Sequence, residues 1–257
     1  LNQTLGPQVA DKQPWLAACA ETKAAWQAFK AERWANPILP DDYWSAPVLT
    51  QPAAIKIATD WAKAQSITCF FDAGDVQANG FQIVEDERPD QTFTETGASY
   101  MGFAASALLA TGVASQPFYA LALTGDGSFT MNPQILIDGV QHGARGCILL
   151  LDNGRMAAIT GLQEAQYGAG FATWNTIQVD YLGWVRAVPG LLALDGGRTP
   201  QALLAALEQA GKHAGLSLIH VPVYYGPDPL GGMGVYGRWN VGNWCDDTQA
   251  LRHQIGL

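Results

Sequence analysis

The middle of the chain alternates between short apolar runs and longer segments of helical character. The apolar runs have the length of β-strands buried on both faces and lie at 66–71, 119–123, 146–151, 191–194 and 216–223. The segments expected to be helical lie at 51–64, 101–110, 132–143, 180–188 and 200–213. The polar, acidic segment 81–94 is expected to be an exposed loop. This alternation predicts an α/β fold with a parallel sheet of about six strands and helices on both faces.

The two ends depart from this pattern and are expected to be appendages. Residues 13–34 are expected to form an amphipathic N-terminal helix, and the proline-rich segment 35–48 an extended linker. The C-terminal tail is rich in Gly, Tyr and Trp and is expected to be irregular. Because such aromatic residues seldom stay exposed, the tail is expected to pack on a partner or over the active site. The expected divisions are 1–50 for helix and linker, 51–223 for the α/β domain and 224–257 for the tail.

Composition narrows the class of protein. A chain of 257 residues with 48% hydrophobic residues can bury a large core, so one domain with appendages is expected. The charged fraction of 14% is low, which suggests that other chains cover part of the surface. The net charge of −9 and the lack of a basic run argue against a nucleic-acid-binding protein. No apolar stretch approaches the ~20 residues of a membrane span, and no basic start followed by an apolar segment suggests secretion.

The cysteines indicate a reducing compartment. Cys19, Cys69, Cys147 and Cys245 are widely spaced and form no CxxC pair. Two of them lie in expected buried strands, so reduced structural thiols are favoured over a metal site or a disulfide. A cytoplasmic location is therefore expected.

The candidate chemistry lies where two of the expected strands end. Gly125-Asp126-Gly127-Ser128-Phe129 follows the strand at 119–123, and Asp152-Asn153 follows the next strand. Parallel strands end at the same sheet edge, where open α/β folds bind ligands. A carboxylate and an amide oxygen suit Mg²⁺ or Ca²⁺, and the glycines let backbone N–H groups approach a phosphate. The pattern predicts a site that holds a divalent cation against a phosphate group.

Three motifs in order resemble a known family. The segment Gly125-Asp126-Gly127-Ser128-Phe129, answered by Asn153 about one βα unit later, looks like the diphosphate-binding signature of thiamine diphosphate enzymes. Residues 96–103 are similar to the cofactor-supporting segment of acetolactate-synthase-like members, and residues 72–77 resemble their earlier phosphate loop. The resemblance covers residues 50–190 and is to the diphosphate-binding, C-terminal domain of the acetolactate-synthase-like and cyclic-diketone-hydrolase-like group.

The resemblance implies roles for individual residues. The side chains of Asp126 and Asn153 and the backbone carbonyl of Arg155 would bind Mg²⁺ or Ca²⁺. The backbone carbonyl of Ser99 would face the aminopyrimidine of thiamine diphosphate, and Met101 would wedge between its two rings. The other residues implied to lie near the cofactor are Gly74, Asp75, Gln77, Gly125, Gly127, Ser128, Phe129 and Met156.

Some positions keep two interpretations. Asp75-Val76 departs from the Gly-Gln-His-Gln usual in the family, and a carboxylate is awkward beside a phosphate, so Asp75 either points away or this loop has another role. Capping and ligand contact are equally compatible with Asp72 and Asp75. Substrate contact and a surface position are equally compatible with Gln163, Glu164 and Tyr167.

The implied activity is that of a thiamine diphosphate enzyme that makes or breaks a C–C bond beside a carbonyl. A carboligase or lyase acting on a 2-oxo acid or α-diketone is favoured over a decarboxylase, a cyclic-diketone hydrolase and an oxidoreductase, the last because no cysteine cluster suits an iron–sulfur site. A diphosphate-binding regulatory subunit is the non-enzyme alternative.

The family's activating glutamate has no evident counterpart in the sequence. In such enzymes it lies on a separate pyrimidine-binding domain. Glu95 is the local candidate here, and it is more typical of a cap. We therefore expect a partner chain that supplies this domain, in a hetero-oligomer such as α2β2. A fragment of a longer chain is the alternative explanation.

Overall fold

The computed structural model describes residues 12–226 and 228–231. The chain divides into two compact units, 1–36 and 37–257, which are described separately. In the first unit, the expected helix forms as α1 (Gln13–Ala35), with a proline in its first turn. Trp26 stacks on Phe29, and the Arg33 guanidinium lies 3.7 Å from the centre of the Phe29 ring. Trp15 and Leu16 of this helix are exposed.

The second unit begins with a β-hairpin where the sequence analysis expected a linker. Strands β1 (Ile38–Asp41) and β2 (Ala46–Leu49) pair antiparallel. The extended conformation expected from the prolines is present, but the linker interpretation was wrong because the two arms satisfy each other's backbone groups. The Trp44 indole N–H donates to the Val223 carbonyl at 3.0 Å, and Leu49 bridges to Val223. The hairpin is thereby joined to the end of the last sheet strand, while the domain boundaries given by the sequence stay a prediction.

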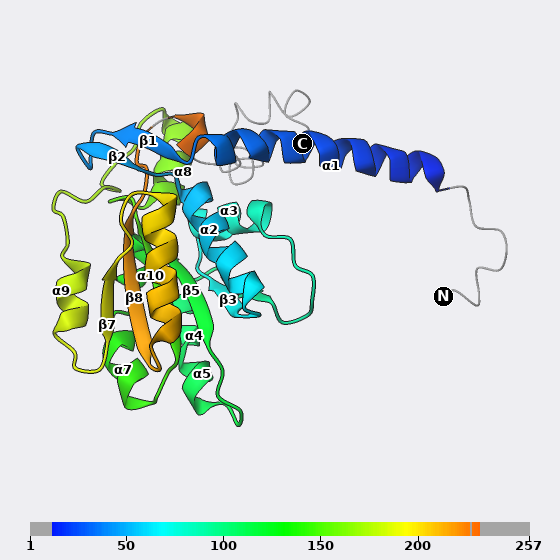
Figure 1. Ribbon diagram of the computed structural model, residues 1–257. Coiled ribbons are helices and arrows are strands. Elements are labelled where there is room, and N and C mark those ends of the chain that lie inside the picture. Colours follow the sequence, from blue (N-terminus) through cyan, green and yellow to red (C-terminus); the bar gives the residue numbers. More distant parts are fainter. Residues whose placement is uncertain (1–11, 227, 232–257) are drawn as a thin grey trace, which may run out of the picture. The chain divides into compact units, whose positions relative to one another are not determined.

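A six-stranded parallel sheet forms the centre of this unit, as the sequence predicted. Its strand order is β4-β3-β5-β6-β8-β7, and every neighbouring pair is parallel. Figure 1 shows the strands behind α2 (Gln51–Ala64) and α10 (Pro200–Lys212). The strands are β3 (Thr68–Phe71), β4 (Thr92–Thr94), β5 (Ala120–Gly125), β6 (Gly146–Asp152), β7 (Leu192–Asp195) and β8 (Leu216–Pro222).

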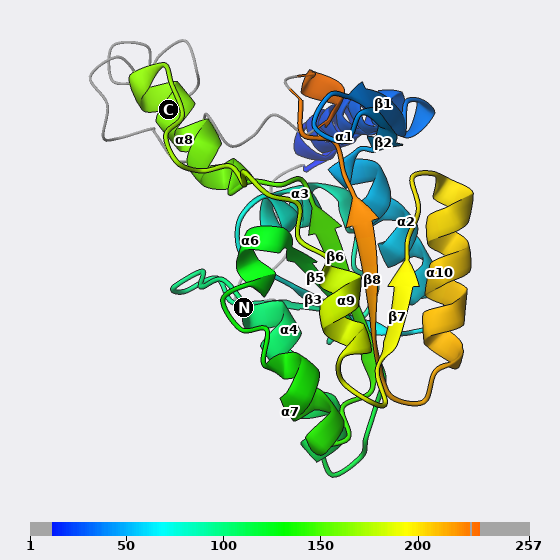
Figure 2. The same ribbon diagram turned by 90° about the vertical axis from the view of Figure 1, so that its left-hand side faces the viewer.

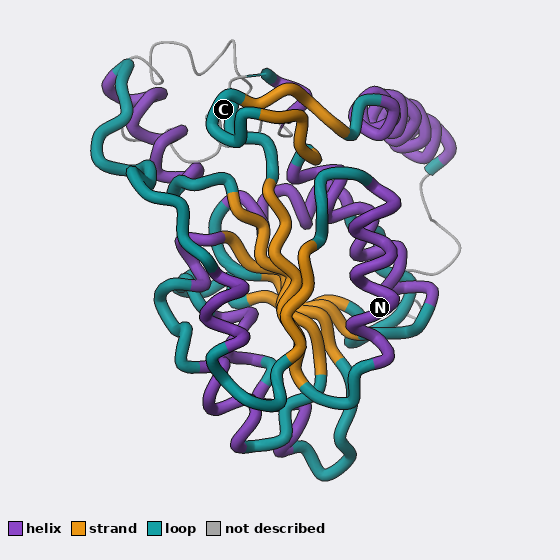
Figure 3. The backbone as a smooth tube through the Cα atoms, turned by 60° about the vertical axis from the view of Figure 1, so that its left-hand side comes forward, coloured by secondary structure: helices purple, strands orange, loops and turns teal. Residues whose placement is uncertain are grey.

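Helices cover both faces of the sheet, which Figure 2 shows from the side. Helices α2 and α10 lie on one face; α4 (Phe103–Ala107), α7 (Ile135–Gln141) and α9 (Tyr181–Arg186) lie on the other. In Figure 3 the strands run through the middle between the two helical layers. The two central strands, β5 and β6, are buried because helices cover both faces of the sheet. Their residues are accordingly almost all apolar. This rigid centre fixes the positions of the loops at the carboxyl ends of the strands.

Local signals account for where the helices begin. Thr50 and Thr199 accept hydrogen bonds from backbone N–H groups in the first turns of α2 and α10, and each helix has a proline in that turn. The Asp180 side chain accepts from Gly183 N at the start of α9. The remaining helices are α3 (Asp75–Ile83), α5 (Leu109–Val113), α6 (Asp126–Phe129), α8 (Ala157–Tyr167) and the 3₁₀ turn η1 (Pro229–Gly231).

The structure corrects three details of the expected elements. The supposed loop 81–94 contains the last turn of α3 and the edge strand β4, whose polar threonines hid the strand pattern. The expected helix 101–110 is broken into α4 and α5. The expected helix 132–143 begins only at Ile135. The tail beyond residue 231 lies outside the described residues, so its packing stays a prediction.

Two negative findings concern the described residues. Cys19, Cys69 and Cys147 are free thiols, while Cys245 lies outside the described ranges. Burial raises the pKa of Cys69 and of Cys147 to about 12, which makes both thiols unreactive. Among the helices that the structure describes, none has the length and apolarity needed to cross a membrane.

Candidate functional site

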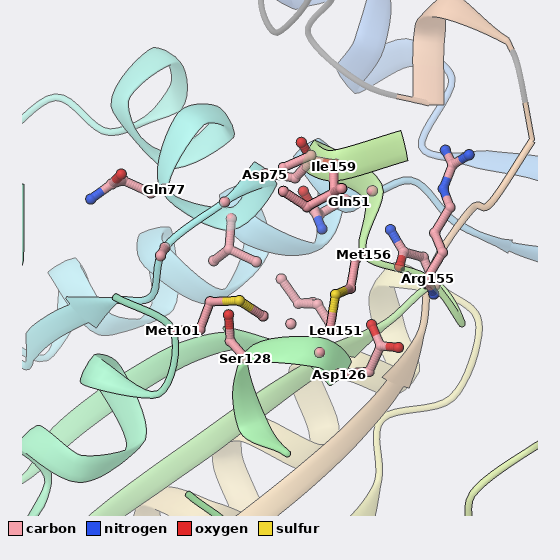
Figure 4. Close-up of a pocket in the computed structure, with 18 of the residues that line it drawn as sticks. Gln51, Asp75, Gln77, Met101, Asp126, Ser128, Leu151, Arg155, Met156 and Ile159 are labelled. Carbon is pink, nitrogen blue, oxygen red and sulfur yellow. Dashed lines mark hydrogen bonds between the residues drawn. The ribbon is translucent and has the colours of Figure 1, made fainter. Parts of the chain in front are cut away.

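The candidate site lies at the point where the order of the strands reverses. From β3 the chain passes to β4 at one edge of the sheet, whereas from β5 it passes to β6 in the opposite direction. Such a switch point leaves a crevice at the carboxyl ends of the strands, where open α/β sheets bind ligands. A cavity of about 550 Å³ occupies this position (Figure 4). It therefore lies where the sequence placed the cation and phosphate site.

The cavity brings together twelve of the thirteen residues that the family resemblance implied. Phe129 is the exception, because its side chain is fully buried in the core against Tyr181 and Trp184. The twelve lining residues are Gly74, Asp75, Gln77, Ser99, Met101, Gly125, Asp126, Gly127, Ser128, Asn153, Arg155 and Met156. Their roles toward a cofactor stay predictions.

Asp126 starts the short helix α6 directly after β5 and is only 3% exposed. Its Oδ2 atom accepts a hydrogen bond of 3.1 Å from the side-chain amide of Asn175. Burial, reinforced by the negative charge of Asp152, raises the pKa of Asp126 to about 7. A cation bound at this carboxylate would favour its charged form again. The local electrostatics therefore suit a metal ion.

The turn after β6 presents oxygen atoms to the same cavity. The Asn153 side-chain oxygen accepts from the Arg155 backbone N–H at 3.2 Å and has a second lone pair left. Gly154 has φ +66°, and a Cβ atom there would meet the Tyr43 ring at 2.3 Å, so only glycine fits this turn. No three His, Cys, Asp or Glu side chains in the described ranges gather into a metal centre. A metal at this site would need the amide and carbonyl oxygens as well as Asp126.

Arg155 extends away from the turn toward the hairpin side of the unit. Its guanidinium lies 4.6 Å from the centre of the Tyr225 ring, and Tyr225 stacks on Tyr43. The Arg155 Nε atom is buried and has no hydrogen-bond partner. A buried unsatisfied donor beside a cavity is costly unless a ligand satisfies it.

Apolar side chains line the other part of the cavity. Met101 and Met156 both project into it, above Ser128 and Asp126 (Figure 4). A Cβ atom on Gly127 would lie 3.3 Å from Met156 Cγ and 3.4 Å from Met101 Cε, so the two thioethers lie over the glycine backbone. The cavity thus has an apolar region beside a polar region of carboxylate, amide and hydroxyl groups.

The first helix turn after β3 also borders the cavity. Gly74 has φ +88° and precedes α3, whose first N–H groups have no partner inside the helix. Asp75 lines the cavity, and burial, partly offset by the charge of Arg155, raises its pKa to about 6. Helix starts of this kind bind phosphate groups. Protonation of Asp75 would lower its repulsion toward such an anion.

The side chain of Gln77 points away from the centre of the cavity (Figure 4). Its amide donates to Thr94 Oγ1 at 2.6 Å and to the Glu95 carbonyl at 3.2 Å, and its oxygen accepts from Ser99 Oγ. Ser99 itself has φ +52°, which is uncommon for a residue other than glycine. Gln77 therefore supports the loop that holds the strained Ser99 backbone.

Two acidic residues near the cavity have structural partners. The Glu95 carboxylate accepts from the Gly97 and Ala98 backbone N–H groups, and these bonds, those of Ala98 first, lower its pKa. Asp72 is fully buried and accepts from the Gly102 N–H at 2.8 Å and from the Thr124 hydroxyl at 2.8 Å. Glu95 is thus a turn cap, and Asp72 connects three elements.

The substrate candidates on α8 are less engaged with the cavity. The Gln163 oxygen accepts from the Phe171 N–H at 2.6 Å, and Tyr167 is exposed. These contacts belong to the α8 segment itself. Ten further residues line the cavity, of which Ala73, Val76 and Thr96 belong to the motif segments 72–77 and 96–103. The others are Gln51, Phe81, Leu151, Ala157, Ala158, Ile159 and Leu162.

Polar partners behind the site were also missed. Asn175 binds Asp126, and the Asp152 carboxylate accepts from His220 Nε2 at 2.9 Å. Asn175 lies in an irregular segment with no motif, so the sequence offered no signal for it. For Asp152 and His220, adjacency of β6 and β8 would have been the signal, but strand order was not predicted.

Comparison with known proteins assigns the family and the fold. Residues 72–221 match the family described as "Thiamine pyrophosphate enzyme, C-terminal TPP binding domain". Among solved structures, benzoylformate decarboxylase from Polynucleobacter necessarius has a TM-score of 0.62 at 18% identity, covering 70% of this chain and 34% of that one. A thiamine diphosphate-dependent 4-hydroxybenzoylformate decarboxylase from Rhodococcus jostii RHA1 has a TM-score of 0.62 at 15% identity, with the same coverage. At these identities the structures show a shared fold.

Curated sequence relatives carry one name. The chain is 29% identical over 198 residues to a 3D-(3,5/4)-trihydroxycyclohexane-1,2-dione hydrolase of Listeria monocytogenes serotype 4b, covering 74% of this chain and 30% of the relative. It is 31% identical over 154 residues to the protein of that name from Lacticaseibacillus casei, covering 58% of this chain and 23% of that relative. The chain therefore spans about 30% of the length of the first of these relatives.

Proposed function

We propose a function for this chain, which belongs to the thiamine pyrophosphate enzymes and contains their C-terminal TPP binding domain. It binds thiamine diphosphate through a divalent metal ion and acts on a C–C bond beside a carbonyl. The observation that supports this most directly is the cavity at the sheet's switch point. It is lined by Asp126, Asn153 and Arg155 on one side and by Met101 and Met156 on another.

The residues present fit the cofactor chemically. The diphosphate needs N–H donors and a cation, which the start of α3, the Gly127 backbone and the oxygens of Asp126 and Asn153 would serve. The apolar rings need the thioether region formed by Met101 and Met156. The buried Nε atom of Arg155 lacks a partner, and a phosphate oxygen is a suitable acceptor for it. We propose Mg²⁺ as the metal, because it commonly completes its shell with substrate phosphate oxygens and water.

When bound, thiamine diphosphate supplies a thiazolium carbon that adds to a carbonyl and a ring that accepts electrons from the breaking bond. This chain's residues would orient and shield that chemistry. Met101 would hold the cofactor in a bent conformation, and the Ser99 carbonyl would accept a hydrogen bond from the aminopyrimidine. Met156, Ile159 and Leu162 would exclude water from the reacting region.

Among reactions, we favour cleavage of a C–C bond in an α-diketone, with a cyclic 1,2-dione as the substrate class. The curated relatives at 29–31% identity are named as hydrolases of such a dione. The carboligase or lyase acting on a 2-oxo acid or α-diketone, which the sequence analysis favoured, has no comparably specific support. The decarboxylases found by structure share the fold at 15–18% identity, which does not favour their substrates here.

We further propose that a pyrimidine-binding domain with an activating glutamate comes from a second protein chain. None of the described residues that line the cavity is a glutamate. Glu95 holds the turn 97–100 with its carboxylate and is therefore engaged. The side chains of Phe81 and Tyr100 lie half exposed near this region, as expected for a surface that another domain covers.

The test is calorimetric titration of thiamine diphosphate with Mg²⁺ into the chain, alone and together with the candidate partner that co-purifies with it. We expect Mg²⁺-dependent binding that is tighter with the partner. Asp126→Ala should abolish the Mg²⁺ dependence while leaving the circular dichroism spectrum unchanged, and Asp138→Ala on α7 is the matched control. Tight Mg²⁺-dependent binding by Asp126→Ala would contradict the assigned metal site.

A further inference from the structure

A buried hydrogen-bonded pair lies directly behind the turn that carries two of the proposed metal ligands. Asp152 is the last residue of β6 and is 4% exposed. One carboxylate oxygen accepts from the Gly154 backbone N–H at 2.9 Å, and the other accepts from His220 Nε2 at 2.9 Å. His220 belongs to the adjacent strand β8. The carboxylate therefore connects the turn to a neighbouring strand of the rigid sheet.

The bond from the Gly154 N–H to Asp152 holds the middle residue of the turn Asn153–Gly154–Arg155. It thereby limits how the flanking residues Asn153 and Arg155 can be oriented. Gly154 lies between Asn153, which lines the cavity, and Arg155, whose carbonyl is the third proposed ligand. The Gly154 conformation at φ +66° is accessible because it is glycine, and glycine also leaves the backbone free to change. A fixed acceptor for its N–H removes that freedom. Asp152 can be such an acceptor only while its own carboxylate is held.

His220 is itself held from two sides. Its ring centre lies 6.3 Å from that of Trp44 on the hairpin and 5.7 Å from that of Tyr181 on α9. Its side chain is only 16% exposed. The imidazole is therefore a rigid donor whose direction is set by packing, as donors that orient metal-binding groups are in other metal sites.

We propose that His220 is a positioning residue that, through Asp152, fixes the turn Asn153–Gly154–Arg155 so that the Asn153 amide oxygen and the Arg155 carbonyl face the metal ion. This inference rests on the proposed function, because it concerns the same metal. In this proposal, the affinity of the site for the metal depends on His220, a residue of β8 that belongs to none of the site's sequence motifs. His220 is not among the residues that line the cavity.

The experiment compares two substitutions of His220 that differ in one donor. His220→Gln can place an amide N–H near the position of the imidazole Nε2, whereas His220→Phe keeps the ring shape and removes the donor. Mn²⁺ serves as a paramagnetic substitute for Mg²⁺. Its binding is measured by the loss of the free-ion electron paramagnetic resonance signal at saturating thiamine diphosphate, for wild type and for each variant assembled with the partner chain. We expect His220→Phe to weaken Mn²⁺ binding about 10-fold or more, and His220→Gln to restore most of the affinity.

A second readout does not depend on metal or cofactor. In the free chain, the Gly154 amide should exchange its hydrogen faster in His220→Phe than in wild type or His220→Gln. A merely structural role would lower the melting temperature of His220→Phe without a selective change in Mn²⁺ affinity. If His220→Phe does not fold, His220→Asn, whose amide is too short to reach Asp152, replaces it.

The outcomes separate this inference from the proposed function. Unchanged Mn²⁺ affinity and unchanged Gly154 exchange in His220→Phe, with binding intact in wild type, would overturn the positioning role alone. Failure of wild type to bind Mn²⁺ with thiamine diphosphate under every condition would overturn the proposed function and this inference together. Weakened binding in His220→Phe with recovery in His220→Gln would support it.

Discussion

At the scale of single residues, the cavity contains polar groups whose burial is unfavourable in the absence of a ligand. Asp126 and Asp75 are carboxylates whose pKa values are raised by burial to about 7 and about 6. Arg155 has a buried Nε atom without a partner. Such groups weaken the ligand-free protein. A metal ion would satisfy Asp126, and a diphosphate oxygen would satisfy Arg155. This is the pattern of a functional site whose cost is met by binding.

Met101 should affect turnover more than cofactor binding. Its thioether lies over Gly127, where it would wedge between the two cofactor rings and hold the bent conformation rather than anchor the diphosphate. We expect Met101→Ala to lower kcat by about 10-fold or more, equivalent to ~1.4 kcal/mol, with a smaller change in the dissociation constant for thiamine diphosphate. Steady-state kinetics and calorimetry of the assembled enzyme measure the two effects. Met131→Ala, at an exposed methionine outside the cavity, is the control, and an unchanged kcat in Met101→Ala would remove the wedge role.

Asp75 should make the free protein less stable as the pH rises. Its folded-state pKa is about 6, above the unfolded value of ~3.9, so the folded state binds more protons between these values. The stability contribution therefore falls as pH rises from about 4 to about 6. Asp75→Asn removes this loss, and we expect it to raise the free energy of unfolding by about 2 kcal/mol at pH 8 and by little at pH 4. Urea denaturation at the two pH values measures this, and an equal effect at both would contradict the raised pKa.

At the scale of elements, one buried carboxylate joins three segments that shape the cavity. Asp72 follows β3, accepts from the Gly102 N–H before α4 and accepts from the Thr124 hydroxyl in β5. Burial raises its pKa despite these hydrogen bonds. Its role is to hold the loop of Ser99 and Met101 against the ends of two strands.

Removal of the Asp72 carboxylate should therefore destabilise the fold. Asp72→Ala would leave the Gly102 N–H and the Thr124 hydroxyl buried without partners, and we expect a loss of about 3 kcal/mol in the free energy of unfolding. Asp72→Asn keeps an acceptor for Gly102 and should cost less. Thermal and urea denaturation compare the two variants. Equal stability of Asp72→Ala and wild type would contradict the structural role.

The elements show what the sequence could and could not predict. Buried parallel strands are recognisable in the sequence as apolar runs. N-cap residues such as Thr50 and Thr199, each followed by a proline, mark helix starts. The sheet and the two helical layers that cover it were therefore predictable. The edge strand β4 was not, because its alternating threonines resemble a polar loop. The hairpin was hidden because prolines tolerated in edge strands resemble a linker. Strand order depends on long-range pairing, so the Asp152–His220 pair had no local signal.

For the site residues too, the sequence could predict some features and not others. Glycine and acid motifs after β3, β5 and β6 were recognisable because their spacing reflects the ends of parallel strands. The directions of individual side chains were not. Gln77 turns toward Thr94 and Glu95, and Phe129 turns into the core, although both belong to the motifs. Motif membership places a backbone at the cavity, whereas packing decides where each side chain points.

At the scale of the whole molecule, the chain spans about 30% of the length of the Listeria monocytogenes relative. In our proposal, the cavity walls described here bind the diphosphate side of the cofactor, and a partner chain supplies the remaining wall. Cofactor and partner would then meet in one shared interface. Two ligands that complete the same site must be thermodynamically coupled.

This coupling gives a prediction that involves no substitution. If the partner chain raises the affinity for thiamine diphosphate and Mg²⁺ by some factor, the cofactor must raise the affinity between the chains by the same factor. For two groups that share one interface we expect a factor of about 5 to 150. Cofactor affinity is measured by calorimetry with and without the partner, and chain association by analytical ultracentrifugation with and without the cofactor. Equal factors well above one would support a shared site. A factor near one in both experiments would mean that the cofactor lies wholly within this chain, and the proposal of a split site would then be wrong.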